Sequence, residues 1–81
     1  MNERIVKVEE VGGFVLRIQF EDGVEGEIDF SEELDGEIFE PLRDTEYFSK
    51  VEIHPLFGAL VWPNGADFAP EYLYSRLKAP V

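Results

Sequence analysis

The chain has 81 residues and no cysteine, which excludes disulfides and thiolate zinc sites. Hydrophobic residues make up 44% and aromatic residues 14% of the chain, so we expect one small folded domain over residues 1–81. Eighteen acidic and 7 basic residues give a net charge of −11, which disfavours direct contact with nucleic acid or an anionic membrane surface. Because no apolar run approaches the ~20 residues of a membrane helix, and no signal peptide is recognisable, we expect a cytoplasmic protein.

Residues 4–30 are predicted to form a three-stranded antiparallel meander with one face in water. Apolar and polar residues alternate in each of its three segments, as is typical of half-buried strands. In the first segment, Val6 and Val8 should share the inner face. The second and third segments, residues 14–20 and 24–30, repeat the alternation and make the prediction stronger.

Side chains of a strand alternate between its two faces, and this parity decides the length of the loop between the second and third strands. A two-residue loop at Asp22 and Gly23 would set Phe20 opposite Glu25 and would mix the core and solvent faces. A three-residue loop over residues 21–23, with Gly23 in the left-handed region, pairs Phe20 with Val24 instead. The same register sets Leu16 opposite Ile28 and Arg17 opposite Glu27.

Residues 31–49 are less periodic and predict short helical pieces. Ser31 is a candidate N-cap for one helical turn that Gly36 would end. Two further pieces are expected at residues 41–43 and 44–48. The aromatic and aliphatic residues of this region form the predicted buried set: Phe39, Leu42, Tyr47 and Phe48.

A β-hairpin is predicted over residues 50–62, again by parity. A four-residue loop at residues 55–58 pairs Ile53 with Leu60 and Val51 with Trp62, which gathers four large apolar side chains on one face. A five-residue loop would separate Trp62 from the others. Gly58 can close the loop at positive φ.

The corner at residues 62–67 follows this hairpin. Trp62, Pro63, Asn64 and Gly65 suit a type I turn, because proline is favoured at its second and glycine at its fourth position. We expect the chain to leave the sheet after Gly65, and the Asp67 carboxylate to accept backbone N–H groups. A last helix is predicted over Pro70–Lys78, covering one sheet face. The predicted fold is therefore α+β: a meander, a short helical middle, a C-terminal β-hairpin and one C-terminal helix.

The string from Val61 to Asp67, with the turn before it and the residues Pro70, Glu71, Leu73 and Tyr74 after it, resembles a bacterial domain-of-unknown-function family, number 2442. The resemblance extends upstream through residues 38–44 and 20–23, and so covers nearly the whole chain. It implies a small α+β domain without an assigned activity. It also implies genes that neighbour another small protein, as in toxin–antitoxin pairs. Some such proteins carry a helix-turn-helix extension, which we do not expect here because the chain ends at Val81.

No residue pattern predicts catalysis, a cofactor or a metal site. An acidic loop starting at Ser31 has Gly36 where a calcium loop needs glycine, but Leu42 stands where a bidentate glutamate is required. His54, the only histidine, is expected on the wet face of its strand, without a neighbour in sequence to orient it as a base.

Two functions are consistent with these observations, and the oligomeric state stays open. The first is a non-catalytic interaction or regulatory module, such as an antitoxin-like member of a two-gene pair, that binds a basic protein through Glu25, Glu27 and Asp29. The second is a ligand-binding domain or enzyme that uses the corner at residues 62–67. Its candidate contact residues are Asn64 and Asp67, and its candidate structural anchors are Trp62, Pro63 and Gly65.

Overall fold

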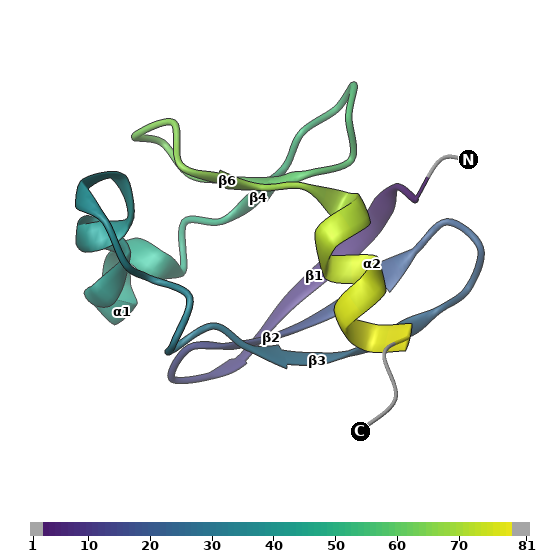
Figure 1. Ribbon diagram of the computed structural model, residues 1–81, viewed down its shortest axis with the longest axis horizontal. Coiled ribbons are helices and arrows are strands. Elements are labelled where there is room, and N and C mark those ends of the chain that lie inside the picture. Colours follow the sequence, from purple (N-terminus) through teal and green to yellow (C-terminus); the bar gives the residue numbers. More distant parts are fainter. Residues whose placement is uncertain (1–2, 79–81) are drawn as a thin grey trace.

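The computed structural model describes residues 3–78, and its N-terminal part is a three-stranded antiparallel sheet. Strands β1 (Ile5–Gly12), β2 (Val15–Phe20) and β3 (Glu25–Asp29) lie in the order β1-β2-β3. Figure 1 shows this sheet, called sheet A below, at the bottom of the molecule. The predicted meander is confirmed.

The β2–β3 loop has three residues, as parity predicts. The Phe20 N–H donates to the Val24 carbonyl at 2.7 Å, and the Gly23 N–H donates back to the Phe20 carbonyl at 2.9 Å. Gly23 has φ 95°, which favours glycine, and the Asp22 carboxylate accepts the Val24 N–H at 3.0 Å. Arg17 lies opposite Glu27, so the predicted register is confirmed.

The prediction for β1 is wrong at Val6. Ile5 pairs with Phe20 and Lys7 pairs with Gln19, so Val6 is an extra residue in a β-bulge. A bulge shifts the alternation by one position. As a result Ile5 is buried and Val8 packs against the core, while Val6 is 52% exposed.

A second antiparallel sheet, sheet B, consists of the short strands β4 (Glu52–Ile53), β5 (Leu60–Val61) and β6 (Asp67–Phe68). Ile53 pairs with Leu60, which confirms the four-residue loop. Gly58 closes this loop with φ 65°. The expectation that the chain leaves the sheet after Gly65 is wrong, because Asp67 pairs with Val61.

The β5–β6 loop repeats the construction of the β2–β3 loop. The Trp62 N–H donates to the Ala66 carbonyl at 2.9 Å, and the Gly65 N–H donates to the Trp62 carbonyl at 3.0 Å. Gly65 has φ 92°, and the Asn64 side-chain oxygen accepts the Ala66 N–H at 3.1 Å. A type I turn followed by a left-handed glycine therefore returns the chain into sheet B.

The helical middle contains a 3-10 helix, η1 (Glu37–Arg43), and a one-turn helix, α1 (Thr45–Phe48), which confirms the two short pieces. Asp44 caps α1 by accepting the Glu46 N–H at 3.0 Å. The helical turn predicted after Ser31 is instead a hydrogen-bonded turn. Its start is held by Asp29, whose carboxylate accepts the Ser31 N–H at 2.9 Å.

The C-terminal helix α2 spans Pro70–Lys78, as predicted. It runs from the end of β6 to the inner face of β3, and so bridges the two sheets (Figure 1). Leu73 is fully buried, and the Tyr74 ring meets the Phe20 ring edge-on at 5.0 Å. Leu77 lies over Gly26, where a side chain would collide with it.

The inner faces of both sheets, the helical middle and α2 share one hydrophobic core. The centre of the core is aromatic. Phe30, which follows β3, packs against Phe48 and Phe68, and Phe48 of α1 also packs against Trp62. The core positions of sheet B alternate with exposed ones, as expected for a sheet with one wet face. The largest fully buried side chains are Phe20, Phe30, Phe48, Ile5, Leu16, Ile18, Leu34, Leu42, Leu60 and Leu73.

The two sheets meet where Gly58 contacts the start of β1. The Ile5 N–H donates to the Gly58 carbonyl at 3.0 Å, and the Arg4 carbonyl accepts the Glu21 N–H at 2.8 Å. A Cβ on Gly58 would lie 2.9 Å from the Arg4 Cα. Only glycine fits, because the approaching atoms are backbone and cannot move aside.

We predict that Gly58→Ala costs about 3 kcal/mol or more, from left-handed strain and the collision with the Arg4 backbone. Gly13→Ala is a matched control, because Gly13 has φ 55° and open space around it. It should cost only about 1 kcal/mol. Urea denaturation measures both, and equal losses would contradict a role for the close approach.

Candidate functional site

The outer face of sheet A carries the acidic residues singled out from the sequence. Glu25, Glu27 and Asp29 are exposed along β3. Arg17, the one basic residue of β2 and β3, lies 3.0 Å from a Glu25 oxygen and 3.7 Å from a Glu27 oxygen. Glu9 of β1 stands on the other side of Arg17. The structure thus brings these carboxylates together on one surface, called the acidic face below.

Asp29 also has a structural role. The Ser31 backbone N–H, helped by the Ser31 side chain, holds the pKa of the Asp29 carboxyl below its ordinary value. The carboxylate therefore stays charged, and one of its oxygens is already used by the turn after β3.

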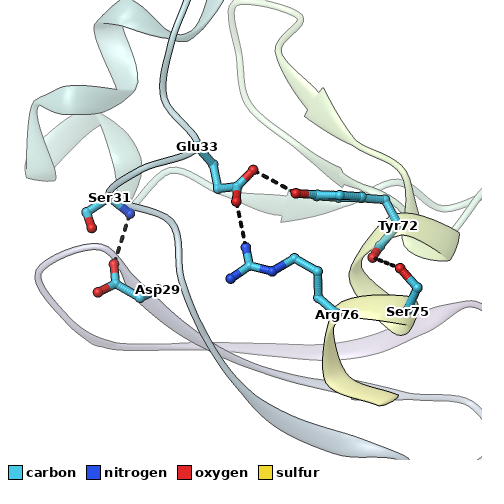
Figure 2. Close-up of polar contacts among 6 residues, drawn as sticks. All are labelled: Asp29, Ser31, Glu33, Tyr72, Ser75 and Arg76. Atoms are coloured by element: carbon cyan, nitrogen blue, oxygen red, sulfur yellow. Dashed lines mark hydrogen bonds and ion pairs between the residues drawn. The ribbon is translucent and has the colours of Figure 1, made fainter. Parts of the chain in front are cut away.

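A polar network ties the next loop to α2. Glu33 accepts a hydrogen bond from the Tyr72 hydroxyl at 2.8 Å and one from Arg76 at 2.9 Å (Figure 2). The hydrogen bond to Glu33 raises the pKa of the Tyr72 hydroxyl. On the same helix, the hydrogen bond to Asp22 raises the pKa of Tyr74. Both shifts stem from contacts that fasten α2, so neither indicates a catalytic group.

Trp62 does not belong to an accessible site. It is 3% exposed, and its indole N–H donates to the Phe48 carbonyl at 2.9 Å. Its ring packs against Phe48 and Phe68. Trp62 therefore joins sheet B to α1 through both an apolar and a polar contact.

Asn64 and Asp67, the two polar residues of the corner, have different surroundings. The Asn64 amide donates to the Ile38 carbonyl at 2.8 Å and so fastens the β5–β6 loop to η1. Pro63 and Gly65 form the exposed part of that loop. Asp67 lies exposed in β6, and the backbone contacts expected for its carboxylate are absent from residues 3–78. The Asn64 side chain is thus engaged in holding the fold, whereas Asp67 is exposed at the surface.

A cleft of about 380 Å³ lies on the outer side of sheet B. Asp67 lines it, but the sequence analysis missed its other residues, which come from the N-terminus, the β4–β5 loop and the start of α2. Leu56 and Phe57 could have indicated this cleft from the sequence, since two large apolar residues are unusual at a hairpin tip. The polar and large apolar residues that line the cleft include Arg4, His54, Leu56, Phe57, Asp67 and Glu71.

His54 holds this loop in place. Its Nδ1 accepts the Leu56 N–H at 3.1 Å and the Phe57 N–H at 3.2 Å. The side chain is half-buried, where the sequence suggested a solvent-facing residue. Because Nδ1 serves as an acceptor, the neutral imidazole carries its proton on Nε2.

The described part of the chain contains no cluster of three or more potential metal ligands and no helix long and apolar enough to span a membrane. Every buried side-chain polar atom in it has a hydrogen-bond partner.

The model of the family described as "Protein of unknown function (DUF2442)" matches residues 5–79. No curated protein and no solved structure gives a significant match.

We predict that Trp62→Ala lowers the free energy of unfolding by about 3–5 kcal/mol, because it leaves a cavity between sheet B and α1. Trp62→Phe should lose about 1–3 kcal/mol, because it leaves the buried Phe48 carbonyl without its donor. Pro63→Ala, at an exposed position of the turn, should cost no more than about 1 kcal/mol, because it only frees the unfolded chain. Urea denaturation monitored by circular dichroism tests all three, and a Trp62→Ala protein as stable as the parent would contradict the anchoring role.

Proposed function

We propose that this chain, which belongs to the DUF2442 family of proteins of unknown function, is a non-catalytic interaction module that binds a basic partner protein through the acidic face. The observation that carries the proposal is the charge imbalance of this surface. Glu25, Glu27 and Asp29 stand on one strand, with alternate residues spaced about 7 Å apart. Arg17 faces them from β2, and Lys7 of β1 is the next basic residue across the sheet, beyond Gln19.

The charge imbalance favours a cationic partner for two physical reasons. Carboxylates held at this spacing repel one another, so an incoming lysine or arginine relieves the repulsion. A surface with a net negative charge also attracts cations over a Debye length of about 10 Å at 0.1 M salt, which speeds association. A protein supplies such cations on a matching surface, whereas nucleic acid would be repelled.

Apolar contact area is available on β1, at the other edge of the same sheet from the β3 carboxylates. The edge strand β1 exposes Val6 and Val11, at 52% and 53%. Interfaces combine desolvated apolar contacts with a charged rim that sets orientation and rate. The bulge at Val6 is what turns one of these valines outward.

The polar groups of the described residues support binding rather than catalysis. The shifted pKa values belong to Asp29, Tyr72 and Tyr74, and a hydrogen bond to a neighbouring residue is the first cause of each. A catalytic acid or base is usually shifted by burial within a cleft. We extend the proposal to a cytoplasmic, antitoxin-like role, in which a basic product of a neighbouring gene is the first partner to test.

The experiment is a pull-down from the native host, followed by measurement of the association rate of the identified partner at several salt concentrations. We expect a basic protein whose association slows steeply between low and physiological salt. Reversal of Glu25 and Glu27 to Lys should weaken binding about tenfold or more, with the fold intact by circular dichroism.

The matched control reverses Glu32 and Glu37, which are exposed and lie outside the acidic face, to Lys. This variant has the same net charge as the first and should bind almost like the parent. Equal weakening by both variants would show that net charge alone matters, and salt-independent binding would contradict the electrostatic interface.

A further inference from the structure

The tip of the β4–β5 hairpin, residues 55–58, exposes two adjacent large apolar side chains. Leu56 is 72% exposed and Phe57 is 67% exposed, more than any other large apolar residue in the described part of the chain. The rest of the aromatic side chains around sheet B pack into the core. Neighbouring exposed apolar residues of this size, on a projecting loop, are typical of contact anchors for another molecule.

The tip is held firmly in this exposed conformation. His54 Nδ1 accepts two backbone N–H groups of the tip. The His54 N–H donates to the Ala59 carbonyl at 2.8 Å, and the Gly58 N–H donates to the His54 carbonyl at 2.9 Å. The Arg4 guanidinium donates to the Leu56 carbonyl and, at 2.9 Å, to the Pro55 carbonyl. Because the loop is already ordered, a ligand would bind without a large entropic cost of fixing it.

The cleft beside the tip has an apolar base, made here of the apolar residues that line it. These are Leu56 and Phe57 of the tip, Ala59 and Val61 at β5 or next to it, and Ala69 and Pro70 at the start of α2. Its volume of about 380 Å³ is in the lower part of the range for ligand clefts. The space therefore suits one or two side chains rather than a large cofactor.

Carboxylates surround this apolar base. Glu3, Asp67 and Glu71 line the cleft, and neither Asp67 nor Glu71 has an ion-pair partner among the described side chains. The one guanidinium of the cleft, on Arg4, directs its donors at the tip carbonyls. The rim thus favours a cation, and a second copy of this chain is disfavoured because its net charge is −11.

We propose that this cleft is a second protein-binding site, whose occupant is a segment that carries a large apolar side chain next to a lysine or arginine. The apolar side chain would lie on Val61 against Phe57, and the cation would meet Asp67 and Glu71. The site shares no residue with the acidic face, so it is independent of the function proposed above.

The test is an NMR titration of the ¹⁵N-labelled full chain with three blocked pentapeptides of glycine-flanked sequence. Their central residues are lysine–leucine–lysine, glutamate–leucine–glutamate and lysine–serine–lysine. We expect the first peptide to shift the amides of the cleft residues, and the other two to bind at least about fivefold more weakly.

Three variants make the test specific. Leu56→Ser combined with Phe57→Ser should weaken binding of the first peptide about fivefold or more, as should Asp67→Asn combined with Glu71→Gln. Ile38→Ser, which removes an exposed apolar side chain elsewhere, should bind like the parent. All of these positions are exposed, and unchanged spectra outside the cleft verify the fold.

The proposal is overturned if the glutamate peptide binds as tightly as the lysine peptide, or if the cleft variants bind like the parent. It is also overturned if the shifts map to the acidic face alone, because the lysines would then report only the general charge of the protein. Concentration-dependent shifts of the tip amides without peptide would identify a second copy as the occupant, and would likewise overturn it.

Discussion

The close approach of Gly58 to the start of β1 is the contact on which the arrangement of the two sheets depends. Sheet B has strands of only two residues, too short to be stable on their own. It persists because the Gly58 carbonyl accepts the Ile5 N–H and because its inner face is covered by the aromatic core. Arg4 adds a second connection, since its backbone bonds to the β2–β3 loop and its side chain to the hairpin tip. One short segment thus sets both the packing of the sheets and the shape of the cleft.

Local geometry was predictable wherever parity or turn chemistry decides it. The two-residue period placed Phe20 against Val24 and Ile53 against Leu60, and both pairings follow from the loop lengths that keep apolar residues on one face. The same reasoning applies after Trp62, where the glycine of a type I turn returns the chain as β6. That strand went unpredicted because Asp67 and Phe68 are too few residues to show an alternation. The prediction for Val6 was wrong for a related reason, since a bulge interrupts the two-residue period on which that prediction rests.

The acidic face could be predicted from the sequence, whereas the cleft could not. The acidic face follows from β3 alone, because Glu25, Glu27 and Asp29 alternate along one strand. The cleft joins Arg4 to Leu56 and Asp67, residues far apart in the chain whose proximity depends on how the two sheets pack. No local pattern encodes that packing. The contact of Trp62 was unpredictable for the same reason: its indole N–H donates to the Phe48 carbonyl, which only the fold brings near.

Many polar side chains of the described residues hold the turns and the C-terminal helix in place. Asp22, Asp29, Asp44 and Asn64 each accept a backbone N–H two residues ahead, so these polar side chains serve the turns of a chain with few long elements. The side chains of Tyr72, Tyr74 and Arg76 form hydrogen bonds that fasten α2 to the rest of the fold. Carboxylates on the outer faces of the two sheets and the apolar tip are exposed in the described part of the chain. Both proposals rest on the ability of such carboxylates, with apolar groups on the same surface, to attract and orient a cationic protein.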